Sequence, residues 1–252
     1  MKHERLLTIA VSSILSFVTA YGAAGCLVSA FALPLEHSLL LITMAAALVS
    51  SLLLVFRHGG TVLLCLAALA CGYIYHDGRA AEQVSRLVLE LSTIYDRAYG
   101  WGILLLAEEM QTATAFDWPV GILSALAAIT VSRCICRQKS VWLPVITALM
   151  PVLPCIVVTD TVPGEIHLLL LLAGLILLIL TTSVRRENAA QGLQLTFGAA
   201  LPVVLGLIVL FLAIPQEGYV NQTVKIQETI RAATRKIPTM MESGMNQLAS
   251  RF

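Results

Sequence analysis

Charged residues are scarce in this sequence. Asp, Glu, Lys and Arg together make up 12% of the 252 residues, against roughly 25% in an average soluble domain. The net charge is only +1, so the composition gives no sign of a polyanionic partner such as a nucleic acid. Because 58% of the residues are hydrophobic, the composition excludes an ordinary soluble domain and indicates a protein whose main partner is the lipid bilayer.

Recognisable cofactor and metal motifs are also missing. Four of the six cysteines lie within apolar runs, where a thiol behaves as a small hydrophobe: Cys26, Cys65, Cys71 and Cys155. Cys134 and Cys136 flank a single residue, but a zinc site needs about four ligands. We therefore expect plain thiols and no cofactor or metal. Palmitoylation or metal binding at the Cys134–Cys136 pair are the alternatives.

Long apolar runs, by contrast, are abundant. The run at 166–184 contains the almost pure Leu and Ile stretch Leu168–Leu180, and it is about long enough to cross a bilayer core of about 30 Å. A helix that is hydrophobic all round must be buried in protein or lipid. The recurrence of such runs predicts an all-α, polytopic transmembrane helix bundle with seven spans, at 6–33, 38–56, 61–75, 118–133, 141–158, 166–184 and 195–214.

Two of these runs have special features. The run 6–33 is too long for a signal-peptide core of about 7–15 residues, and its small residues, among them Gly22 and Gly25, would let another helix approach closely. The run 141–158 contains Pro144, Pro151 and Pro154. Because proline removes a backbone donor and clashes with the preceding turn, we expect a kinked or broken fifth span.

The distribution of positive charge predicts the orientation. If the seven spans alternate from a cytoplasmic N-terminus, the inside receives Lys2, Arg5, Arg57, Arg133, Arg137, Lys139, Arg185 and Arg186. Before the last span ends, the outside receives only Arg79, Arg86 and Arg97. Positive residues mark the cytoplasmic side. We therefore expect a multi-pass membrane protein with a cytoplasmic N-terminus and an extracytoplasmic C-terminus.

Two segments are too polar to span. Within 78–110, apolar residues recur with helical period from Val84 to Ala98, which predicts an amphipathic helix on the outer surface of the membrane or on the outer end of the bundle. The short apolar piece Trp101–Ala107 is expected to be interfacial or shallowly re-entrant. Residues 215–252 are expected to form an extracytoplasmic helical stalk or tail.

The candidate functional residues each have a structural alternative. Tyr95, Asp96, Arg97, Tyr99 and Trp101 could form a docking surface, although amphipathic aromatic residues at a membrane interface need no ligand.

Three further candidate residues lie in or after the fifth span. Asp160 could bind a cation or a partner, or could cap a turn. Pro151 and Pro154 could expose backbone groups to a substrate, or could simply kink the packing. No ionisable residue lies at the centre of a predicted span, which argues against a proton-coupled pump or a voltage sensor.

Several stretches together resemble the N-terminal membrane region of bacterial transglutaminase-like membrane proteins. They are Tyr95–Trp101, Val158–Pro163, Ser183–Arg186, Ala189–Gly192 and Pro215–Val220. The resemblance covers most of the chain up to Val220. It implies a bacterial cell-membrane location and an extracytoplasmic papain-like domain, with a Cys/His/Asp triad, that follows the membrane region.

This sequence has no residues to form that triad after its last span. Neither a cysteine nor a histidine occurs beyond residue 214, so no catalytic residue is assigned and enzymatic activity stays open. The sequence thus predicts a membrane-anchoring region that positions an outer catalytic domain or partner protein. The alternative is a small polytopic transporter or channel with a pathway near the fifth span.

Overall fold

The computed structural model describes residues 2–31, 36–56, 58–76, 117–137, 140–153, 155, 163–185, 189–213 and 228. Within these residues there are seven helices and no strand, which agrees with the all-α prediction. The helices are α1 (Lys2–Ala30), α2 (Glu36–Val55), α3 (Gly59–His76), α5 (Asp117–Arg137), α6 (Trp142–Leu149), α8 (Glu165–Arg185) and α9 (Ala189–Ala213).

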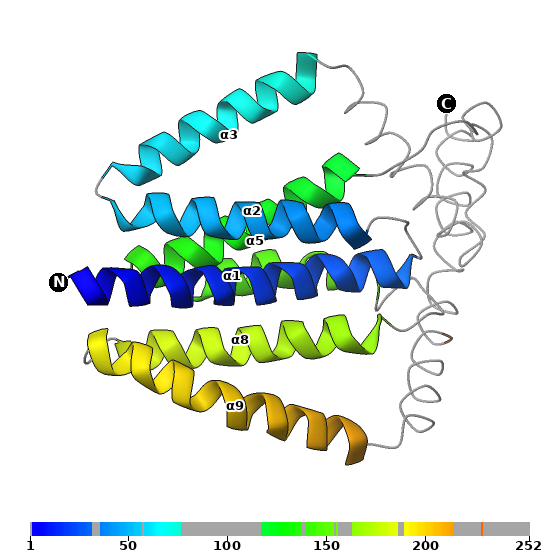
Figure 1. Ribbon diagram of the computed structural model, residues 1–252. Coiled ribbons are helices and arrows are strands. Elements are labelled where there is room, and N and C mark those ends of the chain that lie inside the picture. Colours follow the sequence, from blue (N-terminus) through cyan, green and yellow to red (C-terminus); the bar gives the residue numbers. More distant parts are fainter. Residues whose placement is uncertain are drawn as a thin grey trace, which may run out of the picture.

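The described helices form a bundle in which successive helices run in opposite directions (Figure 1). Each of them overlaps one of the seven predicted spans. Three stretches are long and apolar enough to cross a membrane: Leu6–Ala30, Pro119–Arg137 and Glu165–Ser183. Shorter apolar helical stretches occur at Leu39–Val55, Gly59–Tyr73 and Gly198–Leu210. These findings support a membrane location, and a crossing by the shorter helices stays a prediction.

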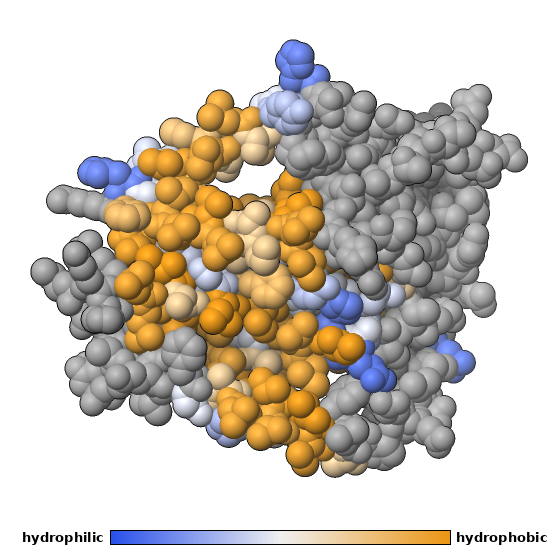
Figure 2. Space-filling model, in the orientation of Figure 1, coloured by the Kyte–Doolittle hydropathy of each residue, from blue (hydrophilic) through white to orange (hydrophobic). Residues whose placement is uncertain are grey.

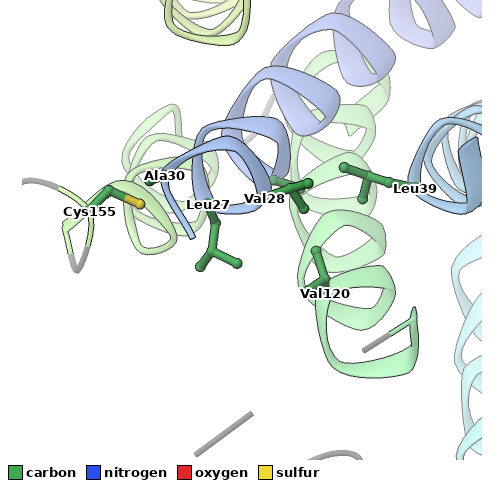
Figure 3. Close-up of a cluster of buried hydrophobic side chains, with 7 residues drawn as sticks. Leu27, Val28, Ala30, Leu39, Val120 and Cys155 are labelled. Atoms are coloured by element: carbon green, nitrogen blue, oxygen red, sulfur yellow. The ribbon is translucent and has the colours of Figure 1, made fainter. Parts of the chain in front are cut away.

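Helix α1 is the centre of the bundle. It packs against α2, α5 and α8 and touches α6 and α9, and Figure 1 shows it between α2 and α8. Near its C-terminal end, α1 meets three other segments in one apolar cluster (Figure 3), made by Leu27, Val28 and Ala30 of α1 with Leu39, Val120 and Cys155. This cluster joins the end of α1 to α2, to α5 and to the residues that follow α6.

Helices α3 and α9 lie at the two flanks. In Figure 1, α3 diverges from α2 as it leaves the turn between them, and its leucines Leu64 and Leu69 are 72% and 70% exposed. On α9, Leu201 is 70% exposed. Figure 2 shows that apolar residues cover much of the visible surface of the described helices. A surface of this kind is consistent with contact to lipid.

The fifth predicted span is interrupted where its prolines indicate. Helix α6 has only 8 residues and carries Pro144 in its first turn, where a missing N–H costs nothing. Met150 and Pro151 form a turn in which Met150 keeps helical φ and ψ angles of -53° and -45°, and the helix is defined again from Val152. Helix α5, which corresponds to the fourth predicted span, is longer than expected and continues past Arg133 to Arg137. The amphipathic segment 78–110 and, apart from Glu228, the tail 215–252 lie outside the described residues.

Candidate functional site: a buried hydroxyl cluster

Serine side chains of α1, α2 and α5 meet in the interior of the bundle. Ser132 Oγ lies 2.7 Å from Ser16 Oγ, 2.8 Å from Ser50 Oγ and 3.1 Å from Ser51 Oγ. Ser51 Oγ also donates to Ser12 Oγ at 3.0 Å. All of these side chains are fully buried. We call this group the serine cluster.

Ser132, at the centre of the cluster, uses its full hydrogen-bonding capacity. A serine hydroxyl can donate one hydrogen bond and accept two, and Ser132 has three hydroxyl neighbours. At one edge of the cluster, the Cys136 thiol donates to Ser12 Oγ at 3.6 Å. A hydroxyl in hydrocarbon without a partner is costly, so the serine cluster favours the one arrangement of α1, α2 and α5 that pairs all its members.

A second hydroxyl contact joins α2 to α5 nearer the other end of the bundle. Thr43 Oγ1 donates to Leu39 O at 2.6 Å and lies 3.3 Å from Ser124 Oγ, which donates to Gly121 O at 3.0 Å. Ser124 precedes Ser132 by about two helical turns. The Thr43–Ser124 contact is therefore separated from the serine cluster by roughly 12 Å along α5.

Alanine side chains fill the space between the serine cluster and the Thr43–Ser124 contact. The layer consists of Ala20 of α1, Ala47 of α2 and Ala127 and Ala128 of α5, each 0–1% exposed. We call it the alanine layer. Its methyl groups offer no hydrogen bond. The serine cluster and the Thr43–Ser124 contact are therefore separate, and the hydroxyls of the α1–α2–α5 core do not line a continuous polar path.

The chemistry available in this core is limited. In the described part of the chain, the fully buried polar side chains are all Ser or Thr. A serine becomes a nucleophile only when an adjacent base activates it, and the serine cluster contains no such base. The described residues also contain no group of three or more His, Cys, Asp or Glu side chains placed to hold a metal. The cluster is therefore suited to fixing helix register.

Glycines let α1 and α8 approach closely along a second interface. A Cβ on Gly22 would lie 2.5 Å from the backbone N of Leu171, and one on Gly25 would overlap the imidazole of His167. That imidazole also packs against the Tyr21 ring, with centroids 5.5 Å apart. The small residues predicted to admit another helix therefore admit α8.

Polar contacts tie this interface near the C-terminal end of α1. The Gly164 N–H donates to Ser29 Oγ at 2.8 Å, just before α8 begins. The Cys155 thiol donates to Pro151 O at 3.3 Å and lies 3.7 Å from Cys26 O. The chain following α6 is thus joined to the last turns of α1.

Of the candidate docking and substrate-site residues named from the sequence, one is described. Pro151 is buried, and its carbonyl accepts the Cys155 thiol, so that carbonyl faces protein. The others lie outside the described residues: Tyr95, Asp96, Arg97, Tyr99, Trp101, Pro154 and Asp160. The docking surface therefore stays a prediction.

The serine cluster was not predicted from the sequence. A signal was present, because Ser12 and Ser16 are four residues apart on one face of an otherwise apolar helix. Comparison with protein-family models, with curated proteins and with solved structures gives no match.

Proposed function

We propose that this chain is a membrane-anchoring region that holds an extracytoplasmic domain in place, as the resemblance to transglutaminase-like membrane proteins implies. The observation that carries the proposal is the α1–α2–α5 core. Its hydroxyls pair with one another across helices, and the alanine layer separates them from the next hydroxyl pair. A core of this kind holds helices in fixed register and offers no polar route to a solute.

The charges at the two ends of the bundle support an orientation. The end where α1 begins carries Lys2, Arg5, Arg133, Arg137 and Arg185, together with Glu4. The opposite end carries Glu36, Asp117 and Glu165. Because positive residues mark the cytoplasmic side, we assign the first end to the cytoplasm of a bacterial cell. Helix α9 runs toward the second end, so residues 215–252 would follow on the extracytoplasmic side.

Seven crossings are part of the same proposal. Besides the three long helices, α2, α3 and α9 each contain a shorter apolar stretch, and α6 with the helical residues after Pro151 would complete the fifth crossing. Short apolar helices can cross where the bilayer thins or flanking residues reach the interface.

Labelling of single cysteines tests the orientation. In a variant without native cysteines, Thr223→Cys should react with a membrane-impermeant maleimide in intact cells. Ser140→Cys, at the basic end, should react only after the membrane is opened. The reverse pattern would contradict the orientation and remove the basis for an outer domain after α9.

Immunoblotting tests the anchoring role itself. Antibodies against residues 222–236 should detect, in native membranes, either a species well above 27.1 kDa or a cross-linked complex with an extracytoplasmic protein. A species of 27.1 kDa that cross-links to no other protein would overturn the proposal.

One observation favours a different function, a small transporter or channel. The break between α6 and Val152 at Pro151 is of a kind that exposes backbone groups to substrates in some transporters. Here the Pro151 carbonyl already accepts the Cys155 thiol. Solute flux in reconstituted vesicles would establish this second function, and its loss in Cys155→Leu would assign the pathway to this break.

A further inference from the structure

The outward face of α5 changes from apolar to cationic along its length. Ile122 and Leu126 are exposed, Ile129 is half-buried, and Arg133 and Arg137 are exposed. These residues follow one another at intervals of four, three, four and four, which places them on a single face of the helix. We call this stripe the Arg133 face. It offers two to three turns of apolar contact followed by two guanidinium groups one turn apart.

The cationic end of the Arg133 face lies next to the end of α2, and α6 packs on the same helix. Arg137 Nη2 donates to Phe56 O at 2.9 Å, directly after α2 ends. One turn before Arg133, Thr130 and Thr147 are hydrogen-bonded at 2.8 Å, which joins α5 to α6. The first residue of α6, Trp142, is 74% exposed. The cationic end of the Arg133 face is thus flanked by structured elements and by an aromatic residue suited to a membrane interface.

We propose that the Arg133 face binds one anionic glycerophospholipid in preference to zwitterionic lipid. Guanidinium groups match the geometry of phosphate oxygens and hold them by charge-assisted hydrogen bonds. The lipid phosphate lies against Arg133 and Arg137, and an acyl chain lies along Leu126 and Ile122. The stripe is roughly 22 Å long, enough for the headgroup region and one leaflet of a bilayer whose core is about 30 Å thick.

Charge is what selects the lipid class. A zwitterionic headgroup carries its own cation, which two neighbouring arginines repel, whereas an anionic headgroup leaves net negative charge for them to compensate. Basic residues next to a membrane surface each strengthen attraction to anionic lipid by about fivefold. The preference itself follows from the Arg133 face. The basic end of the bundle is the cytoplasmic one in the orientation proposed above, and on that orientation the bound lipid belongs to the inner leaflet.

Quenching of Trp142 fluorescence tests the proposal in the full-length chain. The sequence contains three tryptophans, so Trp101→Phe with Trp118→Phe leaves Trp142 as the reporter. The protein is reconstituted in vesicles that contain a minor fraction of brominated phosphatidylglycerol or, in parallel, brominated phosphatidylcholine. We expect stronger quenching by the anionic lipid, and a preference reduced about fivefold by Arg133→Gln.

Two further variants complete the design. Arg185→Gln removes a positive charge near the same end of the bundle without altering α5, and it should leave the preference intact. Arg137→Lys keeps the charge and should retain most of it. Equal quenching by the two lipids, or a preference that Arg133→Gln leaves unchanged, would overturn the proposal. If cysteine labelling instead reverses the orientation, only the leaflet assignment changes.

Discussion

The hydroxyl oxygens of Ser16 on α1 and Ser132 on α5 lie 2.7 Å apart in the interior of the bundle, although 116 positions separate them in the sequence. Ser132 also contacts Ser50 and Ser51 of α2, so one side chain joins three helices. Interhelical hydrogen bonds of this kind are worth on average about 0.6 kcal/mol each in a membrane protein.

Replacing Ser132 should therefore destabilise the bundle measurably. Ser132→Ala removes the shared partner of three buried hydroxyls, and we expect a loss of about 1–2 kcal/mol in the free energy of unfolding. The measurement is equilibrium unfolding in mixed micelles. Ser183→Ala is the control, because Ser183 is exposed near the end of α8 and its loss should change little. Equal stability of the two variants would show that the serine cluster does not hold the three helices together.

Gly22 should tolerate no side chain. A Cβ there would lie 2.5 Å from the backbone N and 2.9 Å from the Cα of Leu171, and backbone atoms cannot rotate away. We expect Gly22→Ala to cost about 1–3 kcal/mol as α1 and α8 are forced apart.

Gly206 provides the matched control on α9. A Cβ at Gly206 meets nothing within 4 Å, so Gly206→Ala should be neutral or should stabilise by up to about 1 kcal/mol through helix propensity. Thermal unfolding of both variants in the same detergent checks the pair. A Gly22→Ala variant as stable as Gly206→Ala would mean that the α1–α8 interface is looser than described.

The sequence was sufficient to predict where the helices lie, because long apolar runs ended by charge or proline leave few alternatives. It could not predict how the helices face one another. Ser50 and Ser51 illustrate the reason: adjacent residues point in directions about 100° apart on a helix, and both are buried only because α1 and α5 lie on either side of them. A helix that is apolar all round carries no pattern that marks its inner face.

Glycine gave a partial signal for the interfaces. The small residues at Gly22 and Gly25 predicted a close helix neighbour, but nothing in the sequence indicated that this neighbour would be α8, since the contact depends on the antiparallel course of two helices far apart in the chain.

Disulfide trapping should confirm the register of α1 against α5. In a background without native cysteines, Ser16→Cys with Ser132→Cys should form a disulfide under mild oxidation, because their side-chain oxygens are 2.7 Å apart and a disulfide needs Cβ atoms about 3.5–4.5 Å apart. Ser16→Cys with Ser124→Cys is the control, displaced by two turns, and should stay reduced. Gel mobility with and without reductant reports the outcome. Equal trapping of both pairs would indicate sliding of α1 against α5.

Cys155 offers a direct test between an anchoring bundle and a transporter. It is 1% exposed and lies beside Pro151, where the transport alternative requires an aqueous pathway. Because methanethiosulfonate reagents react with the thiolate in water, a variant that retains only Cys155 should stay unlabelled in membranes opened to both sides. It should become labelled after denaturation in SDS.

Ser140→Cys in a cysteine-free background is the reference for this test. Residue 140 is exposed at the basic end of the bundle and should be labelled fully under the same conditions. Labelling of Cys155 at a comparable rate, together with its protection by a transported solute, would show that water reaches the break after α6. In that case the sealed α1–α2–α5 core would serve as the rigid wall of a pathway located on the α6 side, and the anchoring proposal would give way to transport.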